Sequence, residues 1–217
     1  MTTTKQMNEE EEQSPDLFKL VEEGDLIKLT EVLEEGQQDL SVRNRWDKSI
    51  LEIAVILGRT EIVKHLITKG GNVNQANKRG YAVLHVGAMW GKRDCLEALI
   101  EAGADINAVT KYNETPKDSA ARYGHKECVD LFESTEARTI LRDAITQARD
   151  LLSNPERILG KWNKDDKSKV TGLCNEKTDW LQRSIEAQSS KESILLQVED
   201  FKQRFDPYFG KLDPLTD

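Results

Sequence analysis

Residues that could ligate a metal or attack a substrate are few in this chain, and they are widely separated. No two histidines have the spacing of a metal site, and no cysteine belongs to a CxxC pair. The motifs GxxxxGK[ST], GxGxxG and GxSxG are absent. We therefore expect structural roles, and no catalytic residue, metal or cofactor, for the histidines and cysteines, which are His65, His85, His125, Cys95, Cys128 and Cys174.

Composition and charge narrow the class of protein. The 217 residues are 32% charged and 37% hydrophobic, which is typical of a soluble chain with much exposed helix surface. No apolar run approaches the roughly 18 residues of a membrane helix, and residues 1–14 lack the pattern of a signal peptide. Because the three cysteines are far apart, we expect reduced thiols and a cytoplasmic protein. The net charge of −8 opposes general binding to nucleic acid or anionic membranes.

Residues 1–14 form an acidic segment with four consecutive glutamates at 9–12 and almost no apolar side chain. This composition is typical of a disordered tail, because too little apolar surface is available to offset the entropy of ordering the chain. An acidic docking segment is the alternative that the same composition allows.

The strongest pattern in the chain is a repeat of 33 residues. Glycine recurs at this spacing at Gly58, Gly91 and Gly124, and Gly24 precedes Gly58 by 34 residues. The same interval of 33 separates Leu51 from Leu84, Leu66 from Leu99, Gly70 from Gly103, and Asn74 from Asn107. Each period holds two short amphipathic stretches, which predicts a helix–loop–helix unit. One such unit cannot bury its apolar face alone, so we expect the units to stack.

In these features residues 15–133 resemble the ankyrin-repeat family. The family signature TPLHxA appears in degenerate form at 49–54 (SILEIA), 82–87 (AVLHVG) and 115–120 (TPKDSA). The resemblance implies that His85, at the signature histidine, hydrogen-bonds backbone between repeats. In the last copy Lys117 and Asp118 replace the usual leucine and histidine, as suits an end repeat with a solvated face. We expect an all-α solenoid of about four repeats.

The same resemblance implies a binding surface on the concave face, formed by the turn tips and the exposed side of the first helix of each repeat. Of the fifteen positions that it selects, six are basic, one is acidic and five are Trp or Tyr, whereas the whole chain has 39 acidic and 31 basic residues. Packing of Trp90 and Tyr123 between repeats is the alternative for those two side chains. Eleven of the fifteen are our predicted partner-binding residues: Arg45, Trp46, Lys78, Arg79, Tyr81, Met89, Trp90, Lys111, Tyr112, Arg122 and Tyr123. The other four are Lys48, Ile56, Leu57 and Glu114.

Beyond the array the pattern predicts three further segments. An amphipathic connecting helix is expected at 134–154, capped near Ser134 or Thr135, and a polar linker at 155–164. A helical hairpin or bundle is expected at 165–217, with Asp165 or Asp166 capping its first helix and Pro207 ending its second.

This last segment is similar to the helical lid of 70-kilodalton heat-shock chaperones, in the runs KDDKSKVTGLCNEKTDWL at 164–181 and FDPYFGKL at 205–212. No sequence resembling the ATPase or peptide-binding parts of those chaperones is present, so no chaperone cycle is expected. The combination of array and lid-like segment resembles ankyrin-repeat proteins of a cytoskeletal, ciliary or cell-division setting.

Three functions are compatible with these observations. The first is a non-enzymatic adaptor whose concave face binds an acidic or amphipathic protein segment. The second is a chaperone-linked regulator, in which the lid-like segment docks on a heat-shock chaperone or its client. Nucleic-acid binding is the third and weakest, because the chain is acidic and lacks a known nucleic-acid motif.

Overall fold

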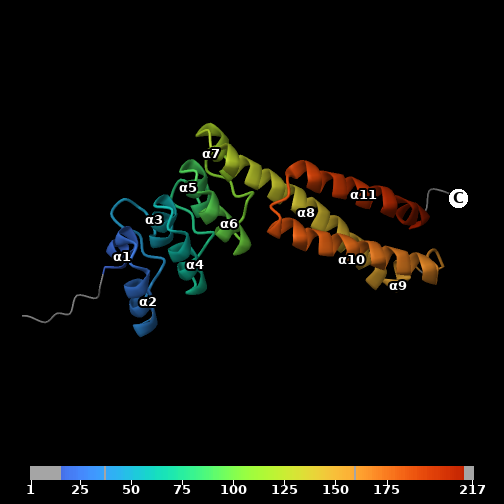
Figure 1. The fold of residues 1–217 in the computed structure, drawn as a ribbon, viewed down its shortest axis with the longest axis horizontal. Coiled ribbons are helices and arrows are strands. Elements are labelled where there is room, and N and C mark those ends of the chain that lie inside the picture. Colours follow the sequence, from blue (N-terminus) through green and yellow to red (C-terminus); the bar gives the residue numbers. More distant parts are fainter. Residues whose placement is uncertain (1–15, 37, 159, 213–217) are drawn as a thin grey trace, which may run out of the picture. The chain divides into compact units, whose positions relative to one another are not determined.

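The computed structural model describes residues 16–36, 38–158 and 160–212, which form helices joined by turns (Figure 1). The predicted acidic tail at 1–14 lies outside these residues. Isolated bridges of Arg43 with Ser49 and of Ala76 with Ala82 are the only β pairing in the described ranges, so the predicted all-α class is confirmed. The chain divides into two compact units, one up to Val129 and one from Asp130.

The first unit is a stack of helix pairs. In each pair, two short helices are joined by a tight turn, and the first helices of successive pairs contact one another: α3 lies against α1 and α5, and α5 lies against α7. The second helices α4 and α6 also pack together. The helices are α1 (Leu17–Glu23), α2 (Leu26–Glu35), α3 (Ile50–Ile56), α4 (Thr60–Thr68), α5 (Val83–Met89), α6 (Arg93–Glu101) and α7 (Pro116–Arg122), followed by the start of α8 (Lys126–Ser153).

The turn glycines between paired helices are needed for two reasons. Gly91 has φ +60°, a conformation that L side chains adopt only at a cost of about 1–2 kcal/mol. A Cβ on Gly91 would also lie 2.5 Å from the imidazole of His125, which belongs to the next repeat. Arg59 approaches Gly24 in the same way, with its guanidinium carbon 2.9 Å from where a Cβ would be. All of these glycines have positive φ, and Gly91 in addition allows the repeat that carries His125 to pack closely on the one before it.

The second unit has a core shared by three helices: α8, α10 (Lys164–Glu186) and α11 (Lys191–Phe209). The unit also contains α9 (Pro155–Ile158) and a 3-10 turn at Gly210–Leu212. Its buried core combines Leu141, Ile145 and Ala148 of α8 with Val170, Leu173, Cys174 and Leu181 of α10 and Val198 and Phe201 of α11. The helix predicted as a connector thus supplies one wall of this core.

Several predicted boundaries in this region differ from the structure. One helix runs from Lys126 to Ser153, and Ser134 does not cap it but donates a hydrogen bond to the carbonyl of Leu131 at 2.9 Å. The predicted linker contains α9 and the buried Trp162, whose indole N–H donates to the carbonyl of Tyr208 at 2.9 Å.

The ends of α10 and α11 also differ from their predicted forms. Asn163 caps α10, and Asp166 is its partner three residues into the helix, so neither Asp165 nor Asp166 is the cap. Pro207 lies inside α11 and does not end it. Within the described ranges, no helix has the length and hydrophobicity needed to cross a bilayer.

Candidate functional site

In three successive repeats, the side chain at one fixed position shapes the turn that precedes the first helix of the repeat. Asn44 Oδ1 accepts from the backbone N–H groups of Trp46 at 3.0 Å and Lys48 at 3.1 Å. Asn77 Oδ1 accepts in the same way from Arg79 at 2.9 Å and Tyr81 at 3.1 Å. Thr110 Oγ1 repeats the arrangement with Tyr112 at 3.2 Å and Glu114 at 3.3 Å. Three rigid turns result.

These turn-building residues were missed by the sequence analysis. Asn44, Asn77 and Thr110 are spaced by 33 residues, so the repeat period could have identified them. Each turn also has one residue in the left-handed conformation, and glycine occupies that position only once, at Gly80 with φ +83°. Asp47 and Asn113, with φ values of 57° and 56°, occupy it in the other two turns. Asp and Asn are among the residues that tolerate this conformation best.

The turns place most of the predicted aromatic residues in solvent. Trp46 and Tyr112, at the tips, are 62% and 67% exposed, and Trp90 and Tyr123, at the ends of α5 and α7, are 55% and 51% exposed. Packing of Trp90 and Tyr123 inside the inter-repeat core, the alternative raised above, is therefore wrong. Tyr81 and Met89 are partly buried.

Four of the five exposed predicted basic residues have no carboxylate partner among the residues that the structure describes. Within the described part of the chain, no ion pair involves Arg45, Lys78, Arg79 or Lys111, and all four are exposed. The Arg45 guanidinium lies over the Trp46 ring, 4.0 Å from its centroid, which is a cation–π contact. These cations are therefore available to a ligand. We call the eleven predicted partner-binding residues the basic-aromatic strip.

Arg122 and Glu114 differ from the other predicted surface residues. Glu114 was placed on the concave face by the repeat pattern, but it is buried at 4% exposure. Its carboxylate accepts from Ser119 Oγ at 3.0 Å and forms an ion pair with Arg122 at 2.7 Å. Arg122 is thus paired with a buried carboxylate, whereas the cations of the strip that have no such partner among the described residues lie on the turns.

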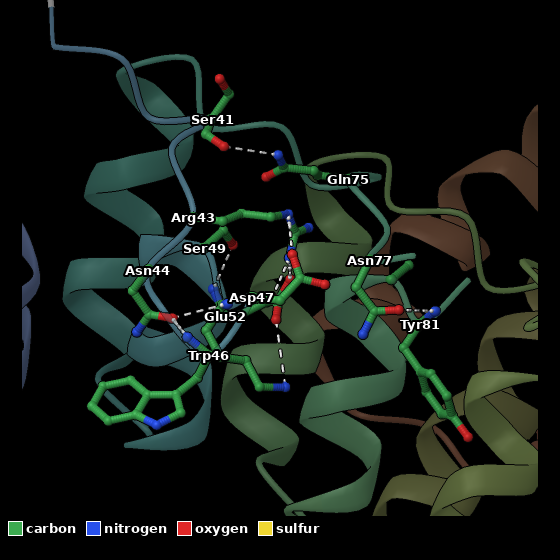
Figure 2. A network of polar contacts seen from close by, with 12 residues as sticks. Ser41, Arg43, Asn44, Trp46, Asp47, Ser49, Glu52, Gln75, Asn77 and Tyr81 are labelled. Atoms are coloured by element: carbon green, nitrogen blue, oxygen red, sulfur yellow. Dashed lines mark hydrogen bonds and ion pairs between the residues drawn. The ribbon is translucent and has the colours of Figure 1, made fainter. Parts of the chain in front are cut away.

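The turns of successive repeats are joined by hydrogen bonds to main-chain carbonyls. Lys111 N donates to the carbonyl of Arg79 at 3.0 Å, and Gln75 Nε2 donates to the carbonyl of Ser41 at 3.1 Å. A Cβ on Gly80 would lie 3.1 Å from the Thr110 and Lys111 backbone, so the two turns are in close contact. Figure 2 shows Trp46 and Tyr81 on neighbouring turns, with their rings diverging from each other. The strip is therefore a row of adjacent, mutually braced turns.

A buried carboxylate anchors the first of these turns. Glu52 occupies the position of the signature histidine, and its carboxylate accepts from Arg43 Nη1 at 2.8 Å (Figure 2). Lys48 Nζ lies 3.6 Å from its other oxygen. Arg43 Nη1 also donates to the carbonyl of Asp47 at 2.7 Å. The ion pair thus ties both sides of the turn that carries Trp46 to α3.

His85 links two repeats, as the signature implied, and this prediction is confirmed. Its Nδ1 accepts from Ala82 N at 3.1 Å, so Nε2 carries the proton that it donates to the carbonyl of Glu114 at 3.0 Å. Burial lowers the pKa of His85, which favours this neutral form. His125 Nε2 similarly donates to the carbonyl of Met89, at 3.1 Å.

The three thiols are not activated for nucleophilic attack. Burial raises the pKa of Cys95, Cys128 and Cys174, which disfavours the nucleophilic thiolate. No cluster of three metal-ligating side chains occurs in the residues that the structure describes.

Comparison with known proteins agrees with the repeat geometry. A family model for ankyrin repeats (three copies) matches residues 17–110 and 51–143. The chain belongs to the ankyrin-repeat family. Ankyrin repeats indicate a protein–protein interaction module, and the family assignment favours a non-enzymatic protein.

One ankyrin-repeat relative resembles most of the chain. The chain is 50% identical over 165 residues to ankyrin repeat domain-containing protein 45 of Mus musculus, an alignment covering 76% of this chain and 66% of the mouse protein. The chain thus spans just under two thirds of that relative's length. Residues 1–133 can supply at most 133 of the 165 aligned positions, so the similarity includes at least 32 residues of the segment 134–217.

Proposed function

We propose that the ankyrin array binds an acidic or amphipathic protein segment through the basic-aromatic strip. The observation that carries this proposal is the combination of exposed aromatic rings with cations that have no carboxylate partner among the described residues, on turns held rigid by their own side chains.

Two physical arguments favour this surface. Trp, Tyr and Arg supply most hot-spot energy in protein interfaces, because they bury a large area and still offer polar contacts. A turn that is already ordered also loses little conformational entropy when it is bound. Since the chain as a whole has a net charge of −8, the cations of the strip would orient an acidic segment toward this face in particular.

The test compares partner capture by the wild-type full chain and by the variant Arg45→Glu, Arg79→Glu, Trp90→Ala. All three residues are exposed, so the variant should fold normally and lose its partners. Arg122 is left unchanged because its removal would leave the buried Glu114 carboxylate without its ion pair. The matched control is Arg142→Glu, Lys202→Glu, Ile27→Ala, whose residues are also exposed and lie outside the strip. An unchanged partner set in the strip variant would refute the proposal.

A second candidate function is a chaperone-linked role for the C-terminal unit. It rests on the lid-like sequence and on an exposed apolar side chain of α11, Leu196, which is 69% exposed on a unit that has its own core. Purified 70-kilodalton heat-shock chaperone should then bind the full chain and bind the Leu196→Asp variant less tightly. Equal binding of the wild-type chain and the Leu196→Asp variant, or no binding of either, would count against a role for this surface. We also propose a cytoplasmic, ciliary or cell-division setting, which rests on the cysteine pattern and on the resemblance of the whole chain and is separate from the chaperone-linked role. Proximity labelling in ciliated cells would test it.

A further inference from the structure

We propose that the four glutamates at 9–12 fold back over the turns of the array and compete with the partner for the basic-aromatic strip. This inference rests on the function proposed for the strip and adds its regulation. The occupant is a named part of this chain, and three features support it: where the chain enters the array, how far the acidic run reaches, and which charges it meets.

The backbone that leads into α1 occupies the same position in its repeat as the turns that precede α3, α5 and α7. Asp16 caps α1 by accepting from Phe18 N at 3.0 Å, and Ser49 caps α3 one repeat later, 33 residues further along the chain. Because α1 packs against α3, the backbone that enters α1 lies at the end of the row of turns that enter α3, α5 and α7. Adding 33 to positions 9–12 gives 42–45, the segment that carries Arg45. In the repeat register, the acidic run therefore corresponds to the segment that leads into the first turn of the array.

The acidic run is long enough to reach two turns. It precedes Asp16 by four to seven residues. An extended chain of that length spans about 13–23 Å at roughly 3.3 Å per residue. Neighbouring packed helices are about 8–10 Å apart, so Arg45 lies about one such step from the α1 entry point, and Lys78 and Arg79 about two. Lys111 is a further repeat away, beyond this reach.

The charges at these turns suit the acidic run. Arg45, Lys78 and Arg79 form no ion pair within the described residues and are exposed. A tethered segment has an effective concentration on the order of millimolar, so weak surface ion pairs are enough to keep it bound for part of the time. The partner then binds only the uncovered fraction of molecules, and its apparent affinity falls by that fraction.

The first test is the full-length variant Glu9→Gln, Glu10→Gln, Glu11→Gln, Glu12→Gln, compared with wild type by backbone amide NMR. The amides of Arg45, Trp46, Lys78 and Arg79 should shift between the two proteins at about 50 mM salt, and the shifts should vanish at about 500 mM because salt screens exposed charges. The control Glu22→Gln, Glu31→Gln, Glu35→Gln, Glu101→Gln makes the same change in net charge at exposed sites on the helices. Identical turn amides in wild type and the tail variant would overturn the proposal.

The second test separates this proposal from the function of the strip. A fluorescein-labelled synthetic peptide of residues 1–16 is titrated into wild type and into the tail variant. The variant should bind it about threefold to tenfold more tightly, because its own tail no longer competes. Adding Arg45→Glu, Lys78→Glu and Arg79→Glu to the variant should abolish binding. Equal binding to wild type and variant overturns tail docking but leaves acid binding by the strip intact. No binding to either overturns tail docking, and the capture experiment above then decides the strip alone.

Discussion

Replacing Glu52 by alanine tests whether a buried ion pair holds the first turn of the array. The Glu52 side chain is fully buried, and Arg43, which donates to it at 2.8 Å, is only 18% exposed. Without Glu52, the mostly buried guanidinium of Arg43 still donates a hydrogen bond to the backbone carbonyl of Asp47. The nearest remaining carboxylate oxygen belongs to the Asp47 side chain and lies 3.9 Å from Arg43 Nε. Lys48 is one-third exposed, so it can turn into solvent.

The expected cost follows from this burial. Removing one partner of a buried ion pair lowers the free energy of unfolding by about 3–5 kcal/mol, because the other charge stays desolvated. Asp118→Ala is the matched control, since Asp118 occupies the same repeat position 66 residues later and is exposed. It loses the capping-box contacts in which Asp118 accepts hydrogen bonds from the Thr115 N–H and hydroxyl, together worth about 1 kcal/mol. Replacing both charges, as Glu52→Leu with Arg43→Met, should cost much less than Glu52→Ala.

Hydrogen exchange of the full chain, followed by mass spectrometry, measures this loss in the array itself. Peptides from α3 and α5 should exchange roughly a hundredfold to several thousandfold faster in Glu52→Ala, because each 1.4 kcal/mol is a factor of ten in the opening equilibrium. In Asp118→Ala the same peptides should change about tenfold or less. Equal acceleration in the two variants would refute the role assigned to the ion pair.

Three further predictions concern substitutions of glycines and of His85. Gly91→Ala should lower the free energy of unfolding by about 2–4 kcal/mol and Gly124→Ala by about 1–2 kcal/mol, because both have positive φ but only Gly91 lies against His125. In urea titrations His125→Ala should recover part of the Gly91→Ala loss, and equal losses at the two glycines would contradict the packing argument. Gly172→Ala should raise the free energy of unfolding by about 0.5–1 kcal/mol, since its Cβ would meet open space on α10, and a lower urea midpoint would contradict this. Burial lowers the pKa of His85 from 6.5, so the unfolded chain takes up its proton first and wild type should lose stability as pH falls below 6.5. His85→Gln should lose less between about pH 7.5 and about pH 5.5, and parallel pH profiles of the two proteins would refute this.

The array could be predicted in detail because its pattern is local. Leu51, Leu84, Leu66 and Leu99 were selected by the 33-residue period, and all four are buried. Each repeat buries its apolar face only against the next one, so position within the period decides whether a side chain is inside. The exposure of Trp46 and Tyr112 followed from the same period, because turn tips have no neighbour to cover them.

The C-terminal unit could be predicted only in part, because its core joins residues far apart in sequence. Trp162 was assigned to a polar linker on the composition of its neighbours, and α11 buries it through the carbonyl of Tyr208, 46 residues later. Lys177 is a second example, because it lies in a charged helix and yet its side chain is buried. Its Nζ donates hydrogen bonds to Asp200 and Gln197 of α11. No local pattern distinguishes these residues from exposed ones.

The sequence by itself determined the repeat, its helices and the row of turns, because each depends on spacing within about 33 residues. Only the tertiary structure decided which charges of the strip are available. Arg79 and Arg122 are both basic residues at predicted surface positions, yet Arg79 has no carboxylate partner within the described ranges and Arg122 serves the buried Glu114. The physical reason is desolvation: a carboxylate inside the array must hold a cation close to it, and the fold alone decides which cation that is.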